Sequence, residues 1–267
     1  DLPFASKVKA DYQGAEVGVM HACGHDNHVA ILMGVAEVLA SMKDSIPGSV
    51  KFIFQPAEEG PPGDEDGGAE LMVEEGVLMD VDAIFGLHVG PAPLGTIGYR
   101  SGGMMASSDS FSIVVKGRQT HGAVPWGGVD PIVIASQIIL GLQTIPSRQL
   151  DSTLTPSIVT VGKIAGGVRF NIIPDEVEML GTIRTFDTEV RKDIHERIKR
   201  TAESIAISAG GTATVDIRKG TPVTSNDPEL TRMMVPSLQD AAGVSNVGEF
   251  PRATTAEDFA YYQRQVP

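Results

Sequence analysis

Cysteine and aromatic residues are scarce in this sequence. It has one cysteine, Cys23, among 267 residues, so no disulfide can form within the chain, which suits a reducing compartment. Aromatic residues make up only 5 %, so a buried core must consist mainly of aliphatic side chains. No run of about 18 apolar residues occurs, and no signal peptide is recognisable after Asp1. We therefore expect a cytoplasmic protein without a membrane-spanning helix.

Basic residues are also outnumbered. Lys and Arg total 21 against 34 Asp and Glu, which gives a formal net charge of −13. Such a negative field repels DNA, RNA and anionic membranes, so we expect neither nucleic acid nor membrane as a partner. The field is compatible with binding of divalent cations, although most of the carboxylates are expected to form an ordinary solvated surface.

The apolar content of 42 % is enough for a substantial core, and the first hundred residues have the pattern of an α/β fold. Helical spacing of apolar residues predicts helices over about 26–43 and 69–75. Short apolar runs predict buried strands at 50–54 and 83–87. Strands alternating with helices favour a mainly parallel sheet flanked by helices.

The pattern changes after Gly102-Gly103. The predicted elements are, in order, a strand at 111–115, a helix from Asp130-Pro131 to about 144, strands at 157–162 and 176–182, a helix from about 187, and a strand at 212–217. This βαββαβ order is that of the split ferredoxin-like unit. The sequence therefore predicts a catalytic domain in two parts, residues 1–104 and an incomplete 218–267, with an inserted lid and dimerisation domain at 105–217.

Residues 21–28, HACGHDNH, contain the only thiol and several imidazoles. Cys23 and His25 are ligand types suited to a borderline-soft metal such as zinc, and the glycine between them allows a tight turn. A chance His-rich loop before a helix is the ordinary alternative for such a short cluster.

Further candidate residues follow predicted strands. Glu58 and Glu59 come soon after the strand at 50–54, and His88 ends the strand at 83–87. Ligands gather at the carboxyl ends of strands in α/β sheets, so we expect these groups to converge with Cys23 and His25. Taken alone, the Glu58–Glu59 pair could be a solvated acidic turn, and His88 could be a structural histidine. His121 lies in a Gly-rich turn of the inserted domain. It could be a structural loop residue, or it could donate a hydrogen bond to an oxyanion in a neighbouring site.

These segments together resemble the M20 metallopeptidase superfamily, specifically its amidohydrolase branch of hippurate hydrolases, N-acyl-amino-acid amidohydrolases and auxin-conjugate hydrolases. The matching stretches are MHACGHDNHVA, FIFQPAEEG, GLHVGP, THGAVPWGGVDPI, FNIIPDEVEMLGTIRTF and TTAEDFA. They follow the family's order over nearly the whole chain, and the cysteine at position 23 is typical of this branch.

The resemblance assigns roles to nine residues. It implies metal ligands at Cys23, His25, Glu59 and His88, a general base at Glu58, and a lid histidine at His121 that acts on the partner subunit. Substrate contacts are implied at Asn171, Arg184 and Glu257. It also implies two divalent ions per subunit, zinc, manganese, cobalt or nickel, and a homodimer formed through the inserted domain.

The sequence departs from the family pattern in three places. The family has a further His ligand near its C-terminus and an Asp-containing motif upstream of the first residue here, and neither is present. We therefore expect a sequence truncated at both ends. Trp126 stands where relatives often carry His, which bears on substrate preference.

The function implied is hydrolysis of the amide bond of an N-acyl amino acid or a similar small amide, by a metal-bridging water that Glu58 activates. Two alternatives remain. Cys23 could be the nucleophile of a cysteine amidase, in which case Glu58 and Glu59 would have no role. The chain could also be an inert binding protein on an M20 scaffold.

Overall fold

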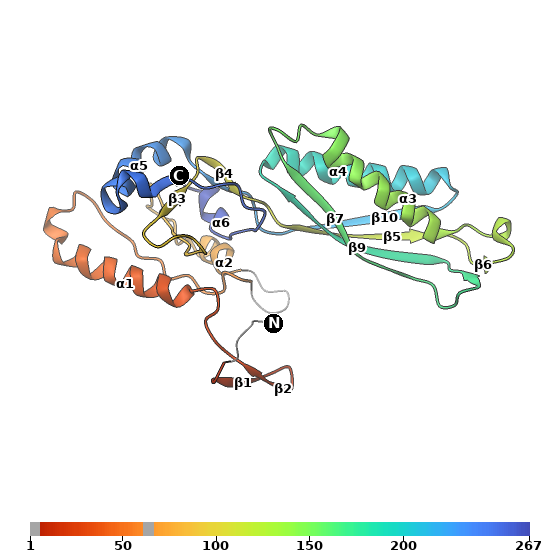
Figure 1. Ribbon diagram of the computed structural model, residues 1–267, viewed down its shortest axis with the longest axis horizontal. Helices are drawn as coiled ribbons and strands as arrows, with labels where there is room; N and C mark the ends of the chain where they lie inside the picture. The colour runs from red at the N-terminus through yellow and green to blue at the C-terminus, as the bar shows by residue number, and fades with distance from the viewer. Residues whose placement is uncertain (1–5, 61–66) are drawn as a thin grey trace. The chain divides into compact units, whose positions relative to one another are not determined.

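The computed structural model describes residues 6–60 and 67–267 of the chain (Figure 1). They belong to two compact units, one comprising Asp1–Gln55 with Phe85–Leu94 and the other Pro56–Ile84 with Gly95–Pro267. We call these unit 1 and unit 2. The domain boundaries predicted at residues 104 and 217 do not coincide with this division and stay predictions.

Unit 1 begins with an antiparallel hairpin of β1 (Lys9–Tyr12) and β2 (Ala15–Gly18). Its two turn residues, Gln13 and Gly14, have φ angles of 51° and 79°, as a tight turn between twisted antiparallel strands requires. Helix α1 (His25–Ser41) follows and confirms the helix predicted near the Cys/His motif.

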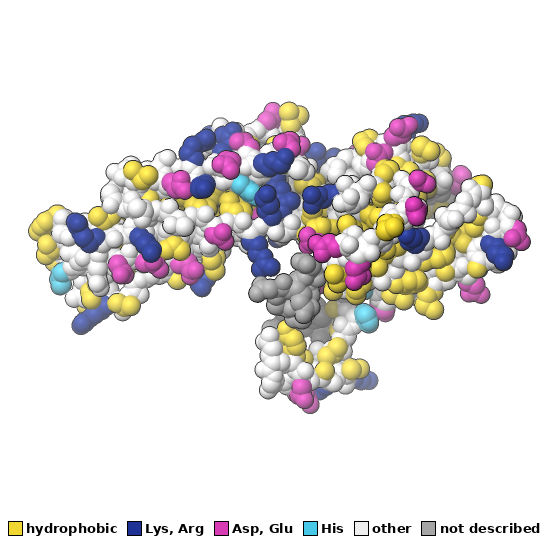
Figure 2. Space-filling view, turned by 180° about the vertical axis from the view of Figure 1, so that it is seen from behind, with side chains coloured by type: hydrophobic (Ala, Val, Ile, Leu, Met, Phe, Trp, Pro, Cys, Tyr) yellow, Lys and Arg dark blue, Asp and Glu magenta, His cyan; other side chains and the backbone are white. Residues whose placement is uncertain are grey.

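Helix α1 exposes much of its apolar surface. None of its residues is buried, and a short 3₁₀ helix (Lys43–Ser45) follows it. Hydrophobic side chains are visible on the surface over this helix (Figure 2), and the exposed ones are Val29, Ile31, Met33, Val35 and Val38.

The strands predicted at 50–54 and 83–87 are absent, since both segments lie outside any strand. An apolar run predicts burial, but a strand also needs a neighbour to accept its hydrogen bonds, and the local sequence does not specify that neighbour. Among the described residues, parallel pairing is limited to β3 (Ile97–Tyr99) with β12 (Val247–Glu249) and a bridge between Met105 and Ala253. The prediction of a mainly parallel sheet is therefore wrong for this part of the chain.

Unit 2 contains one region of helices and short strand pairs. Its remaining elements are α2 (Gly68–Glu74), β4 (Gly102–Met105), β11 (Thr224–Asn226), α5 (Pro228–Ala242), a 3₁₀ helix (Val244–Asn246) and α6 (Ala260–Gln263). Strands β4 and β11 pair antiparallel, with a bulge between Thr224 and Ser225. This pair lies where the chain enters and leaves the larger sheet of the same unit.

The larger sheet of unit 2 has the strand order β10-β5-β9-β7, and all its pairs are antiparallel. Its elements are β5 (Asp109–Lys116), α3 (Pro131–Thr144), β7 (Ser157–Gly166), β9 (Glu176–Thr185), α4 (Thr188–Ser208) and β10 (Thr212–Lys219). Helices α3 and α4 cover one face of the sheet (Figure 1). A π-helical turn (Ile145–Gln149) extends α3.

The core of unit 2 lies between this sheet and its two helices. Alternate residues of β5, such as Ile113 and Val115, face the helices and are fully buried, as are Ile138 of α3 and Ile198 of α4. The period of two along the strand and of about 3.6 along each helix brings these aliphatic side chains to one interface. The core is aliphatic, as the low aromatic content predicts.

Side chains at the helix starts fix where α3 and α4 begin. The Asp130 carboxylate accepts hydrogen bonds from the backbone N–H groups of Ile132 and Val133, at 2.9 and 3.3 Å. Asp187 accepts in the same way from Glu189 and Val190. Each carboxylate satisfies backbone donors that have no partner within the helix.

Three short elements complete unit 2. Strand β6 (Thr120–His121) pairs antiparallel with β8 (Ile172–Ile173), and a 3₁₀ helix (Pro125–Gly127) follows β6. Strand β6 lies at the end of the four-stranded sheet opposite to β4 (Figure 1). None of the helices in residues 6–60 and 67–267 combines the length and apolar character that a bilayer crossing requires.

Candidate metal centre

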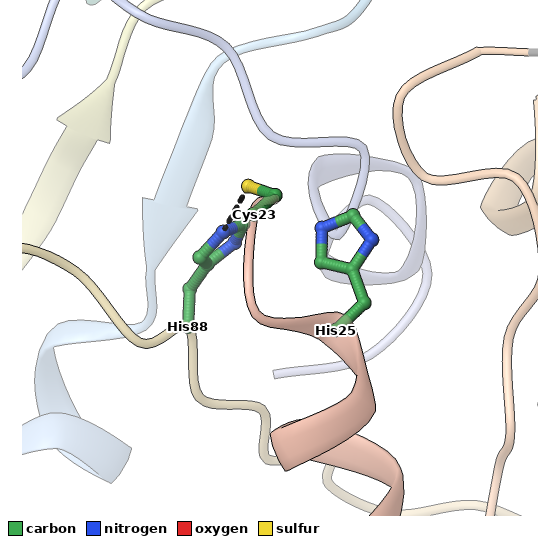
Figure 3. A group of neighbouring side chains, drawn as sticks. All are labelled: Cys23, His25 and His88. Atoms are coloured by element: carbon green, nitrogen blue, oxygen red, sulfur yellow. Dashed lines mark hydrogen bonds between the residues drawn. The ribbon is translucent and has the colours of Figure 1, made fainter. Parts of the chain in front are cut away.

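Three metal-ligand side chains converge in unit 1. Cys23 precedes α1, His25 is its first residue, and His88 lies on the segment Phe85–Leu94 (Figure 3). The Cys23 Sγ and His88 Nε2 atoms are 3.8 Å apart, and one ligand atom from each of the three residues lies within 4.8 Å of the others. Zinc bonds sulfur at about 2.3 Å and imidazole nitrogen at about 2.0 Å, so atoms at this spacing can share one ion.

The turn between Cys23 and His25 depends on Gly24. Its φ angle of 89° is in the left-handed region, which glycine adopts without strain. A Cβ atom at this position would also lie 2.8 Å from Cγ2 of Val89, next to His88 in sequence. The glycine gives the tight turn expected from the motif, and it also allows the α1 start and the His88 segment to approach closely.

A third histidine, His28, belongs to the same cluster, although no role was predicted for it. Its ring lies 5.1 Å from that of His88 and 6.0 Å from that of His25, measured between centroids. Its Nε2 atom accepts a hydrogen bond of 3.3 Å from the backbone N–H of Val89. The sequence does contain a signal for His28, because a spacing of three residues places His25 and His28 on one face of the predicted helix.

The paired carboxylates Glu58 and Glu59 lie in a tight turn of unit 2. Ala57 has a φ angle of 50° and Gly60 one of 92°, and the Gly60 N–H donates to the Ala57 carbonyl at 3.2 Å. Glu58 is half-buried and Glu59 exposed. The turn thus gives two adjacent carboxylates different surroundings, as separate roles would require.

Both carboxylates line a cavity of about 390 Å³ within unit 2. Its wall also contains the acidic residues Glu70 and Asp258, and two cationic residues, Arg218 and Lys219. The carboxylates of this wall attract divalent cations, and its two cationic residues attract anionic groups. The contribution of Arg218 and Lys219 was not expected, because no local motif marks them.

Glu257 and Asp258 precede α6, and Asp258 lines this cavity. The Asp258 carboxylate, 6 % exposed, accepts a hydrogen bond of 3.2 Å from the backbone N–H of Ala69 in the first turn of α2. The Glu257 carboxylate accepts one of 3.3 Å from Phe259. Asp258 therefore has a structural role, while Glu257, predicted to contact substrate, lies just before the turn that leads into α6.

A tyrosine in the cavity wall is held in its neutral form. Burial, together with a hydrogen bond to Glu70, raises the pKa of Tyr261 well above its ordinary value. The adjacent Tyr262 is buried, and burial raises its pKa to about 12. Neither phenol loses its proton near neutral pH, so both can act only as neutral hydrogen-bonding groups.

His121 lies far from this cavity along the sheet of unit 2. Residues 218–221 of the cavity wall adjoin Asp109 at one end of β5, and His121 follows the other end at Lys116. Seven steps of about 3.4 Å make the intervening strand roughly 24 Å long. The His121 side chain is exposed, and its Nδ1 atom accepts a 3.0 Å hydrogen bond from Ala123 N–H.

The two remaining predicted substrate residues lie on different elements. Asn171 is next to His121, because its carbonyl accepts a 2.8 Å hydrogen bond from Gly122, and its side-chain Oδ1 is buried without a donor among the described residues. Arg184 lies within β9 and pairs in register with Ile158 of β7. The structure thus brings Asn171, but not Arg184, into the His121 turn.

Comparison with known proteins decides the family. Residues 1–267 match peptidase family M20/M25/M40 over their full length. The chain belongs to this family. The match is consistent with the thiolate and imidazole cluster of unit 1 and the paired carboxylates of unit 2, which lie in the segments that carried the resemblance.

Relatives of this M20 chain include hydrolases of small amides. It is 40 % identical over 269 residues to an N-acetyl-L-cysteine deacetylase of Bacillus subtilis, covering 100 % of this chain and 62 % of that protein. It is 36 % identical over 269 residues to an IAA-amino acid hydrolase of Arabidopsis thaliana, covering 100 % and 60 % respectively. The chain therefore spans less than two thirds of the length of these relatives.

A solved structure extends the comparison to the fold. A dinuclear metal binding peptidase from the M20 family of Bacillus subtilis is 38 % identical, with a TM-score of 0.79. The match covers 100 % of this chain and 65 % of that one. The mixed α/β character expected from the sequence is thereby confirmed.

Proposed function

We propose that this chain forms much of the active site of a two-metal amidohydrolase that cleaves N-acyl amino acids or similar small amides. The observation that carries the proposal is the convergence of Cys23, His25 and His88, whose ligand atoms lie within 4.8 Å of one another. The names of the deacetylase and the IAA-amino acid hydrolase among the relatives support the substrate class.

The donor set fits the metals that the family implies. One thiolate and two imidazoles suit a borderline-soft divalent ion, and we assign Cys23, His25 and His88 as ligands together with Glu59. Zinc, manganese, cobalt and nickel all accept such ligands. When bound, two divalent ions supply the Lewis acidity that polarises the scissile carbonyl and acidifies a water molecule.

Glu58 is the proposed general base. Its carboxylate lines the cavity of unit 2 and is half-buried, whereas the neighbouring Glu59 is exposed and suited to bind an ion. Glu58 would accept a proton from the attacking water and deliver it to the leaving amine nitrogen. The balanced reaction converts an amide and water into a carboxylic acid and an amine, which exist at neutral pH as a carboxylate and an ammonium ion.

His121 is the proposed oxyanion donor, acting on the site of a second subunit. The position of His121 beyond the far end of β5 from residues 218–221 supports action in trans, since an imidazole cannot span a strand of roughly 24 Å. The βαββαβ region would then be a ferredoxin-like lid and dimerisation domain. Its edge strand β7 could pair with a copy of itself across a two-fold axis.

Three further residues are proposed to hold the substrate. The buried Asn171 Oδ1 atom lacks a donor among the described residues, and an acceptor in that state favours a ligand N–H group. Arg184 can donate hydrogen bonds to an oxygen atom of the substrate, and Glu257 can accept them from a cationic or N–H group. The cytoplasmic location also stays a prediction.

One observation favours a second candidate. The 3.8 Å contact of Cys23 Sγ with His88 Nε2 is also what a cysteine nucleophile and its base would show. The relatives named as deacetylase and dinuclear metal binding peptidase support the metal hydrolase instead.

Metal removal and restoration test the proposal. The protein would be stripped with a chelator, its metal content measured, and hydrolysis of a panel of N-acyl amino acids followed by amine release. Activity should disappear on stripping and return with zinc, manganese, cobalt or nickel. Persistent activity in the stripped protein, abolished by thiol alkylation, would identify the cysteine amidase.

A further inference from the structure

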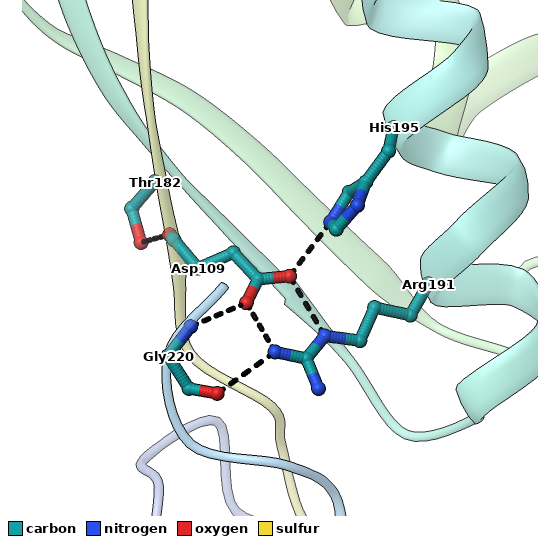
Figure 4. Close-up of polar contacts among 5 residues, drawn as sticks. All are labelled: Asp109, Thr182, Arg191, His195 and Gly220. Carbon is teal, nitrogen blue, oxygen red and sulfur yellow. Dashed lines mark hydrogen bonds and ion pairs between the residues drawn. The ribbon is translucent and has the colours of Figure 1, made fainter. Parts of the chain in front are cut away.

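A buried charge cluster lies beside the cavity of unit 2. Asp109, the first residue of β5, is 2 % exposed, and its carboxylate contacts two side chains of α4 and the backbone of the residue after β10 (Figure 4). Arg191 of α4 donates through Nε at 2.8 Å and also through Nη2. His195 Nε2 lies 2.7 Å from the same carboxylate. Gly220 donates its backbone N–H at 3.0 Å.

The carboxylate of Asp109 is ionised under all ordinary conditions. Burial disfavours its charge, but hydrogen bonds from Arg191, His195 and Gly220 outweigh that effect and lower the pKa to about 2. The cluster therefore consists of a carboxylate and a guanidinium removed from water. Apolar side chains of similar volume commonly give equal or greater stability at such places, so stability alone does not account for it.

The cluster holds the main chain of Gly220 from both sides. Besides the N–H bond to Asp109, the Gly220 carbonyl accepts a hydrogen bond of 2.9 Å from Arg191 Nη2. The neighbouring Thr221 carbonyl accepts one of 2.9 Å from Ser108 N–H. A Cβ atom on Gly220 would clash with the Ser108 carbonyl, so only glycine allows this approach.

The segment held in this way is a wall of the cavity. Residues 218–221 line it together with Glu58 and Glu59, and they include both cationic residues of the wall, Arg218 and Lys219. An N-acyl amino acid carries a carboxylate, which the acidic residues of the cavity repel and the two cationic residues attract.

We propose that residues 218–221 form the wall that receives the substrate carboxylate, and that Asp109 and Arg191 are positioning residues that fix this wall opposite the Glu58–Glu59 turn. The inference rests on the proposed amidohydrolase function. Arg218 and Lys219 act directly on the substrate charge. Asp109 and Arg191 act through Gly220 and touch no substrate.

Two variants test the positioning role in the metal-loaded protein. Asp109→Asn keeps the side-chain volume but removes the charge, and Arg191→Lys keeps the charge but loses the bidentate geometry and the bond to Gly220. The matched control is Asp193→Asn on α4, whose partner is Arg197 and whose pair is partly exposed. If Asp109→Asn fails to fold, Arg191→Lys still tests the role, because it retains an ion pair with Asp109.

The first measurement is hydrogen exchange of the backbone amides of residues 218–221, which needs no activity. Both variants should exchange faster there, and the control should not. The second is hydrolysis of an N-acetyl amino acid. KM should rise about tenfold with kcat changed less than about threefold, because ground-state binding of the carboxylate is lost while base and metals remain.

The outcomes separate the two proposals. A folded Arg191→Lys protein with unchanged exchange at 218–221 overturns the positioning role, as does unchanged KM in an active variant. A wild-type protein that binds metal but hydrolyses no acyl amino acid overturns the proposed function. The exchange measurement still decides whether Asp109 and Arg191 fix the wall in that case.

Discussion

The Nδ1 atom of His121 accepts a hydrogen bond of 3.0 Å from the backbone N–H of Ala123. A neutral imidazole carries one proton, so an accepting Nδ1 places that proton on Nε2. The Nε2–H group is therefore a hydrogen-bond donor, and it lies on the opposite side of the ring from the Nδ1 atom that contacts Ala123. A fixed donor of this kind suits an oxyanion, whose charge develops only in the transition state.

His121 should therefore be needed in trans. We expect His121→Ala to lower kcat by about 10²–10³, the usual effect of losing one oxyanion donor. Co-refolding His121→Ala with Glu58→Gln should restore activity in heterodimers, because one of their two sites then has an intact base and an intact partner histidine. Native mass spectrometry would count the heterodimers. Heterodimers without recovered activity would show that His121 acts in cis or has no catalytic role.

Glu58 should be essential for turnover but not for metal content. Glu58→Gln keeps the size of the side chain but cannot accept a proton, so kcat should fall by about 10²–10⁴. Metal stoichiometry should stay that of the wild type, measured by elemental analysis on the same sample. Glu74→Gln, an exposed carboxylate at the end of α2, is the control. Full activity of a metal-replete Glu58→Gln protein rejects Glu58 as the base.

Cys23 should be a metal ligand. Cys23→Ser replaces a thiolate with a hydroxyl that stays protonated, so the affinity for zinc should fall about tenfold or more. Competition with a chromophoric chelator gives the affinity. His195→Gln is the control, a histidine variant outside the Cys23, His25 and His88 cluster. An unchanged affinity would mean that the contact between Cys23 and His88 serves only to pack the turn.

Asp109 should contribute to stability in a defined acidic range. Its pKa is about 2 in the folded protein against an ordinary value of 3.8, so the ionised form favours folding. The contribution, about 2 kcal/mol, is complete above pH ~4 and is lost as the pH falls toward ~2.

Urea unfolding between pH 2 and 5 measures this contribution. The stability difference between wild type and Asp109→Asn should shrink as the pH falls through this range, whereas the difference for Asp193→Asn should stay small. A difference that does not depend on pH would show that Asp109 stabilises the fold by packing rather than by its charge.

Gly181 should tolerate no side chain. A Cβ atom there would overlap the ring of Phe111 and the carbonyl oxygen of Thr160 in neighbouring strands. Gly181→Ala should lower the free energy of unfolding by about 1–3 kcal/mol, as overpacking a tight core does. Gly162→Ala is the control, because a Cβ atom there meets nothing within 4 Å. Equal stability of the two variants in thermal unfolding would contradict the prediction.

The sequence predicted the βαββαβ elements well, because local signals define them. Apolar residues alternate along β5, recur at helical spacing in α4, and the N-caps Asp130 and Asp187 mark where the helices begin. The same reasoning failed at 50–54 and 83–87. An apolar run records that a segment avoids water, whereas strand formation depends on a partner that lies elsewhere in the chain.

For the candidate site, the sequence by itself determined which residues can bind a metal, because thiolate and imidazole chemistry belongs to the residue. It also located the turn at Gly24 that places Cys23 beside His25. Only the tertiary structure decided that His88, 65 residues away, lies 3.8 Å from Cys23. It alone joined Asp109 to Arg191 across 82 residues, because a buried charge pair forms only where packing brings two distant segments together and excludes water.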